Sequence, residues 1–170
     1  TGSSAIDNHF KPYDIVIDVK PFETIDISVV CTIEEEKPRP AFEIIRSYRQ
    51  RIGQLVEKSG LDDPLAKSLV RAADQFIAYR KSTGLKTILA GFPWFADWGR
   101  DTMIALTGLT LCTKQFDACA EILRTFAYYV KKGLVPNMFP DEGSDPIYNT
   151  VDASLWYFYA VDRYLKYTGK

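Results

Sequence analysis

Apolar and polar residues alternate along two stretches near the start of the chain. Residues 13–19 form the first stretch, and residues 23–33 form the second. The apolar side of the second stretch consists of Ile25, Ile27, Val29, Cys31 and Ile33. A period of two is typical of a half-buried strand, and Lys20-Pro21-Phe22 between the stretches predicts a turn. Because two strands alone are barely stable in water, we expect a short β-hairpin or the remnant of a larger sheet.

Farther along the chain, apolar residues recur every three or four positions, which predicts helices. The predicted helices cover residues 42–59, 64–80, 101–112, 114–132 and a last segment from 150 onward. Gly60 is a typical helix stop, and Asp63 followed by Pro64 is a typical helix start. Residues 82–84 interrupt the second helix, and residues 86–89 are expected to be a short extended piece. The fold class is therefore mainly α.

Two of these helices, 101–112 and the one from 150 onward, are apolar on nearly every side, which is typical of inner helices. The helix 114–132 is amphipathic, as expected of an outer helix. Inner and outer helices thus alternate, and the most unusual loops precede the inner ones. This order favours helical hairpins arranged in a ring or an arc, although no fixed repeat period is present.

Composition narrows the function classes. The chain has 170 residues, a net charge of −1 and no basic block, which disfavours nucleic acid or an anionic membrane as partner. Three cysteines argue against a disulfide framework, and we expect Cys112 and Cys119 to be buried in a reduced, cytoplasmic protein. The chain has a single histidine and no Gly-rich phosphate loop, so the sequence predicts neither a metal site nor a cofactor.

A charged segment with two prolines, residues 34–40, reads as a linker. We therefore predict two parts: residues 1–38, the end of a β-rich domain with its linker, and residues 39–170, a set of helical hairpins. Both ends of the sequence suggest a piece of a longer polypeptide.

The loop from Ala90 to Thr102 carries most of the distinctive chemistry. It contains Trp94, Trp98, Arg100 and Asp101, separated by glycine and proline residues that keep it out of a regular helix. Flat aromatic faces suit the C–H face of a sugar ring, while arginine donates to hydroxyls and aspartate accepts from them. The alternative is structural: Asp101 caps the next helix, and Arg100 is its surface ion-pair partner.

A second group, from Tyr148 and Asn149 to Asp152, also precedes an apolar helix. Its structural alternative is a Thr150 cap with Asp152 complementing the helix dipole. The group follows a long loop, residues 134–149, and long loops are often functional. The acids of that loop, Asp141, Glu142 and Asp145, lack the spacing of a calcium site and are expected to be solvated turn residues.

Residues 90–106, Ala-Gly-Phe-Pro-Trp-Phe-Ala-Asp-Trp-Gly-Arg-Asp-Thr-Met-Ile-Ala-Leu, resemble the signature of the amylo-α-1,6-glucosidase domain of glycogen debranching enzymes. Residues 133–137 and 148–156 are similar to the next two blocks of that family, in the same order. The resemblance implies an (α/α)6 toroid that hydrolyses the α-1,6-linked glucose at glycogen branch points, so the expected partner is glycogen or an α-glucan oligosaccharide. The implied substrate-binding residues are Trp94, Trp98, Arg100, Asp101, Asn137, Tyr148, Asn149 and Asp152, with Arg100 and Asp101 binding sugar hydroxyls in the −1 subsite.

The resemblance also implies an inverting mechanism with a general acid and a general base. In the family these carboxylates lie in later blocks, so we expect them beyond Lys170, and we expect this chain alone to be inactive. It also holds fewer helices than a complete toroid. Two alternatives stay open: another toroidal glycosidase, such as a glucoamylase or trehalase relative, and a helical scaffold that binds a partner protein.

Overall fold

The computed structural model describes residues 11, 13–32, 39–91, 95–140 and 145–170. The chain divides into two compact units, Thr1–Ile44 and Ile45–Lys170. The predicted division at residue 38 stays a prediction.

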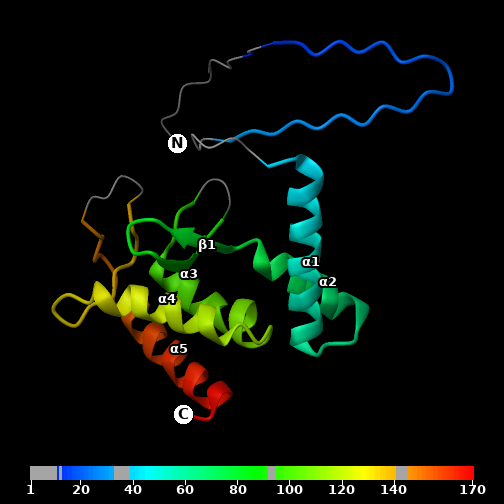
Figure 1. Ribbon diagram of the computed structural model, residues 1–170. Coiled ribbons are helices and arrows are strands. Elements are labelled where there is room, and N and C mark those ends of the chain that lie inside the picture. Colours follow the sequence, from blue (N-terminus) through cyan, green and yellow to red (C-terminus); the bar gives the residue numbers. More distant parts are fainter. Residues whose placement is uncertain (1–10, 12, 33–38, 92–94, 141–144) are drawn as a thin grey trace. The chain divides into compact units, whose positions relative to one another are not determined.

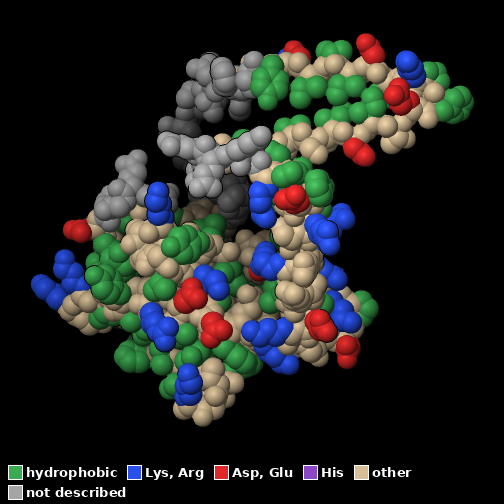
Figure 2. Space-filling model, viewed as in Figure 1, with side chains coloured by type: hydrophobic (Ala, Val, Ile, Leu, Met, Phe, Trp, Pro, Cys, Tyr) green, Lys and Arg blue, Asp and Glu red, His purple; other side chains and the backbone are tan. Residues whose placement is uncertain are grey.

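The first unit contains the predicted turn but not the predicted strands. Glu23 donates its amide hydrogen to the Lys20 carbonyl (3.1 Å), which closes the turn at Pro21 and Phe22. Residues 13–20 and 23–32 are not assigned to any strand. Their apolar side chains stay exposed, Val16 to 86%, and Figure 2 shows apolar groups along this segment. Alternation favours a strand only where a partner surface covers one face, and the apolar side chains of this stretch stay exposed.

The second unit begins with most of α1 (Ala41–Ser59) and with α2 (Pro64–Asp74). Gly60 follows α1 with a φ of 69°, a conformation that favours glycine, so the predicted stop is confirmed. Asp63 caps α2, because its carboxylate accepts the Ala66 amide hydrogen (2.9 Å), and Pro64 occupies the first turn as expected.

The second predicted helix is shorter than expected. α2 ends at Asp74, and the residues up to Arg80 form strand β1 (Ile77–Arg80), which pairs antiparallel with β2 (Leu85–Ile88). The extended piece predicted at 86–89 is thus confirmed, but its partner strand was predicted as helix. The prediction failed because Phe76 and Tyr79 continue the helical spacing of apolar residues in α2. That spacing does not show that residues 77–80 pair with the strand after the next turn.

The remaining helices are α3 (Gly99–Leu106), a π-helical continuation η1 (Thr107–Leu111), α4 (Phe116–Tyr128) and α5 (Asp152–Thr168). α3 packs against α5, and α4 packs against β2 and α5 (Figure 1). The core lies among these elements and is formed by Ile88, Met103, Leu106, Leu111, Cys119, Ile122, Leu123, Phe126, Val135, Phe139 and Ala160. The fold is therefore mainly α with one small antiparallel sheet.

Two expectations about burial are corrected. Cys112 is exposed, whereas Cys119 is fully buried as predicted, and burial raises the pKa of the Cys119 thiol to about 11. The helices predicted to be apolar all round, α3 and α5, leave apolar residues exposed, among them Ile104, Leu155 and Phe158. α4 buries more residues than either of them, because it lies between β2 and α5. Among the described helices, none is long and apolar enough to cross a bilayer.

Candidate functional site

The aromatic loop leads directly into α3. Ala90 donates to the Ala96 carbonyl (3.0 Å), and Gly91 pairs with Phe95, so the two sides of the loop are tied together. Trp98 occupies the capping position of α3 with extended backbone and makes no side-chain cap hydrogen bond. Asp101 therefore lies inside the first turn of α3. The structural alternative that made Asp101 the N-cap is wrong, although a first-turn acid still complements the helix dipole.

A second loop, residues 134–149, pairs with the first. Trp98 bridges to Met138, and Met138 bridges in turn to Ile147. The Gly99 amide donates to the Asn137 carbonyl (2.7 Å), and the Asn137 amide donates to the Ile147 carbonyl (2.8 Å). These backbone contacts hold together two segments that are about forty residues apart in sequence.

Gly99 is the point of closest approach between the two loops. A Cβ atom at this position would lie 2.2 Å from the Pro136 carbonyl oxygen and 3.4 Å from the Ala153 Cβ. No side chain fits in that space. The glycine in the Trp-Gly-Arg-Asp motif is therefore required by packing between the loops and α5.

Arg100 joins the two groups of predicted site residues. Its Nη1 donates to Asp152 Oδ2 (3.2 Å), and its Nε lies 4.0 Å from Asp101 Oδ2. Asp101 is in the first turn of α3 and Asp152 in the first turn of α5, so the packing of these two helices brings both carboxylates to one guanidinium. All three side chains are between one third and about one half exposed. They consequently keep hydrogen-bonding capacity for a ligand.

The pKa of Asp152 is lowered. The Thr150 hydroxyl beside the carboxylate is the largest cause, followed by the Arg100 guanidinium and by the Ala153 amide, which donates to Oδ1 (2.8 Å). The Arg100 and Ala153 contacts meet hydrogen-bond geometry, whereas the nearby Thr150 hydroxyl does not. Asp152 is therefore a stable anion near neutral pH. Thr150 does not cap α5, which begins at Asp152 with Val151 at the cap position.

A pocket of about 280 Å³ lies beside this charged group. It is lined by Ala90, Phe95, Trp98, Arg100 and Asp101. Aromatic rings and a methyl group share this pocket with a cation and an anion. A pocket of this kind fits a ligand that has both apolar faces and many hydroxyl groups.

The other predicted residues that the structure describes do not line this pocket, and they make different contacts. Asn137 is buried, and its side-chain amide donates to the Asn149 side chain (2.9 Å), which links the two ends of the second loop. The Tyr148 hydroxyl donates to the Tyr129 carbonyl after α4 (2.6 Å), and burial is the main cause of its raised pKa. Trp94 falls within residues 92–94 and lies outside the described residues, as do Asp141 and Glu142. Among the residues that are described, His, Cys, Asp and Glu form no cluster of three that would hold a metal ion.

Sequence reasoning missed Asp97, Arg80 and Thr87. Asp97 lies in the aromatic loop itself, but it is completely buried and accepts hydrogen bonds from Arg80 and Thr87 of the small sheet. A charged residue among aromatic neighbours, in a loop already marked as special, was the available signal. Its partners lie on β1 and β2, and β1 was predicted as helix.

Fold and site together define a mainly helical domain with a polar and aromatic pocket where two helices begin. A family model described as amylo-alpha-1,6-glucosidase matches residues 71–170. The chain belongs to this family. The glycogen debranching enzyme of Saccharomyces cerevisiae is 33% identical to it over 124 residues, which is 66% of this chain and 8% of the relative. No solved structure matches the chain.

Proposed function

We propose that the chain is part of a glycogen debranching glycoside hydrolase that cleaves α-1,6-linked glucose from an α-glucan. In this proposal it supplies one wall of the −1 subsite of an (α/α)6 toroid in a cytoplasmic enzyme. The general acid and base are contributed by other parts of a longer polypeptide. Membership of the amylo-α-1,6-glucosidase family and similarity to the yeast enzyme support this proposal.

One observation supports the proposed role most strongly: Arg100 contacts Asp152 and approaches Asp101 at the edge of a pocket lined by Trp98. A glucose ring has an apolar face for the indole and hydroxyls for the charged groups. A hydrogen bond to a charged group contributes about 1.5–3 kcal/mol, more than a neutral one. This geometry favours a role in binding a sugar.

The general acid of the reaction is proposed to be a residue other than Asp152. A general acid needs a pKa raised toward the working pH, and Asp152 has a lowered one. Its contact with Arg100 is one cause of that lowered pKa. Asp152 is therefore suited to holding Arg100 in place and to accepting hydrogen bonds, and it is unsuited to protonating a leaving group.

The test is Asp101→Asn in the full-length protein, with Asp117→Asn as matched control. Both aspartates are exposed first-turn acids, one in α3 and one in α4, so both substitutions remove the same interaction with a helix dipole. We expect kcat/KM on a glycogen limit dextrin to fall about ten- to hundredfold for Asp101→Asn alone. Melting temperatures should change little and to a similar extent. Equal activity of the two variants would remove Asp101 from the substrate-binding wall.

A further inference from the structure

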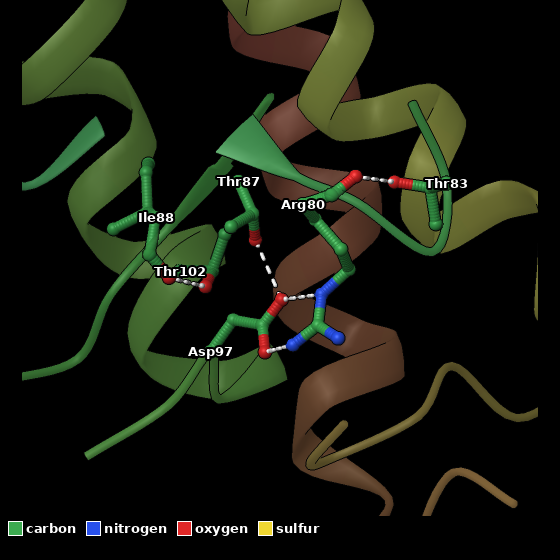
Figure 3. Close-up of polar contacts among 6 residues, drawn as sticks. All are labelled: Arg80, Thr83, Thr87, Ile88, Asp97 and Thr102. Atoms are coloured by element: carbon green, nitrogen blue, oxygen red, sulfur yellow. Dashed lines mark hydrogen bonds and ion pairs between the residues drawn. The ribbon is translucent and has the colours of Figure 1, made fainter. Parts of the chain in front are cut away.

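A buried charged cluster joins Asp97 of the aromatic loop to the small sheet (Figure 3). Its residues do not line the pocket that we propose for sugar. The Asp97 carboxylate is fully buried, and the Arg80 side chain is 14% exposed. Arg80 donates from Nε to Asp97 Oδ2 (2.6 Å) and from Nη2 to Oδ1, which makes a two-point contact. The Thr87 hydroxyl donates to the same Oδ2 atom (2.7 Å). Both oxygens of the buried Asp97 carboxylate thus accept hydrogen bonds within one cluster.

This cluster is attached to both loops of the site. Asp97 immediately precedes Trp98, and its own carbonyl accepts the Phe139 amide hydrogen (3.3 Å). The Arg80 guanidinium also lies over the Phe139 ring, 5.1 Å from its centroid. One cation therefore contacts the side chain of the first loop and an aromatic ring of the second.

A buried ion pair of this kind often contributes little to the free energy of unfolding. Removing two charges from water costs free energy that their attraction often fails to recover, and apolar side chains of similar size frequently stabilise as much. A two-point contact between arginine and carboxylate instead fixes the orientation of the two side chains relative to each other. Here the fixed element is the backbone at Asp97, three residues before Arg100.

We propose that Arg80, Thr87 and Asp97 are positioning residues that hold Trp98, Arg100 and Asp101 in the geometry needed to bind a glucosyl unit. The small sheet then has a specific role, because β1 carries Arg80 and β2 carries Thr87. This inference rests on the proposed function for the ligand. The geometric part, that the cluster orders the loop, stands independently of the sugar.

The chain offers a matched control for the ion pair. Arg51 and Asp74 also form a two-point contact, with distances of 2.7 and 2.6 Å, but they join α1 to α2 and the Arg51 side chain is 55% exposed. Asp74→Asn therefore removes the same chemistry from a pair that belongs to neither loop. Thr87→Ser is the second control, because it keeps the hydroxyl that Thr87→Val removes.

The experiment measures amide hydrogen exchange of residues 95–102 in the full-length protein. Exchange should be about tenfold faster in Asp97→Asn, and faster to a smaller degree in Thr87→Val, because the loop opens more readily. It should be unchanged in Asp74→Asn and in Thr87→Ser. If Asp97→Asn does not fold, Thr87→Val decides the question. Unchanged exchange in the folded Thr87→Val variant would overturn the proposal.

A second measurement concerns the ligand. Binding of the glucose mimic 1-deoxynojirimycin is measured by calorimetry well below the melting temperature of each variant, so that a loss of stability alone does not change the affinity. Asp97→Asn and Thr87→Val should weaken binding by about tenfold and by a smaller factor, respectively, and Asp74→Asn should not. Faster exchange with unchanged affinity would overturn the positioning role and leave the proposed function intact. No binding by the unmodified protein would contradict the proposed function, while hydrogen exchange still decides whether the cluster orders the loop.

Discussion

Gly99 lies where the two loops of the site come closest, and this contact gives a prediction at the residue scale. Gly99→Ala should destabilise the 170-residue chain by about 1–3 kcal/mol, because the new methyl group must displace the Pro136 backbone. Gly108→Ala is the matched control. Gly108 is helical, and a methyl group there would meet no neighbouring atom within 4 Å, so alanine should stabilise by up to about 1 kcal/mol. Denaturant unfolding of both variants measures the difference, and equal effects would show that the loop contact is looser than described.

Asp152 gives a second prediction at this scale. Its pKa is lower in the folded chain than the ordinary value of about 3.9. The carboxylate therefore stabilises the fold at pH values above that ordinary value, and the contribution disappears as pH falls through the lowered folded value. Carbon NMR titration should show the pKa of Asp152 rising in Thr150→Val and in Arg100→Leu. A titration curve that neither variant moves would contradict the assigned causes.

At the same scale, the sequence draws attention to residues at the pocket but not to the buried cluster of Arg80, Thr87 and Asp97. Trp98, Arg100, Asp101 and Asp152 stand out because charged and aromatic side chains near glycine-containing loops are chemically conspicuous, and their role in binding stays a prediction. Arg80 was hidden, because an arginine that follows a helical pattern is normally a solvated residue. Only the pairing of β1 with β2 shows that it points toward a buried carboxylate.

At the scale of elements, caps and stops were predicted well because they depend on local chemistry. Asp63 supports a direct test. Asp63→Ala should cost about 0.5–2 kcal/mol of stability, whereas Asp63→Asn should cost little because asparagine caps nearly as well. The neighbouring Asp62 has a fully exposed side chain, so Asp62→Ala is the control and should be close to neutral. Equal losses for Asp62→Ala and Asp63→Ala in thermal melts would mean that the cap contributes nothing.

Elements that depend on distant partners were predicted less well. Periodicity placed β1 inside a helix and placed strands at 13–19 and 23–33, where the structure assigns none among the residues it describes. Both errors have one cause: a strand is defined by what pairs with it, and hydrophobic spacing does not contain that information. The N-termini of α3 and α5 differ from the expected ones by two residues each, for the related reason that Asp101 and Thr150 resemble caps in sequence.

At the scale of the whole molecule, the proposal predicts that the isolated 170-residue chain releases no glucose from glycogen limit dextrin. Inverting hydrolysis needs two carboxylates in distinct acid and base roles, and Asp152 is held as an anion beside Arg100. The full-length protein serves as positive control, and a mock purification serves as blank. Glucose release by the isolated chain above that blank would show that it contains the catalytic pair.

We propose that Arg100 and Asp101 contact the sugar, and a crystal structure of the full-length protein with bound glucose would show these contacts. We predict that glucose hydroxyls lie about 2.6–3.2 Å from the Arg100 guanidinium and the Asp101 carboxylate, with the ring against Trp98. The proposal would be contradicted if glucose were bound at another site of the protein while Arg100 still faced solvent beside Asp152.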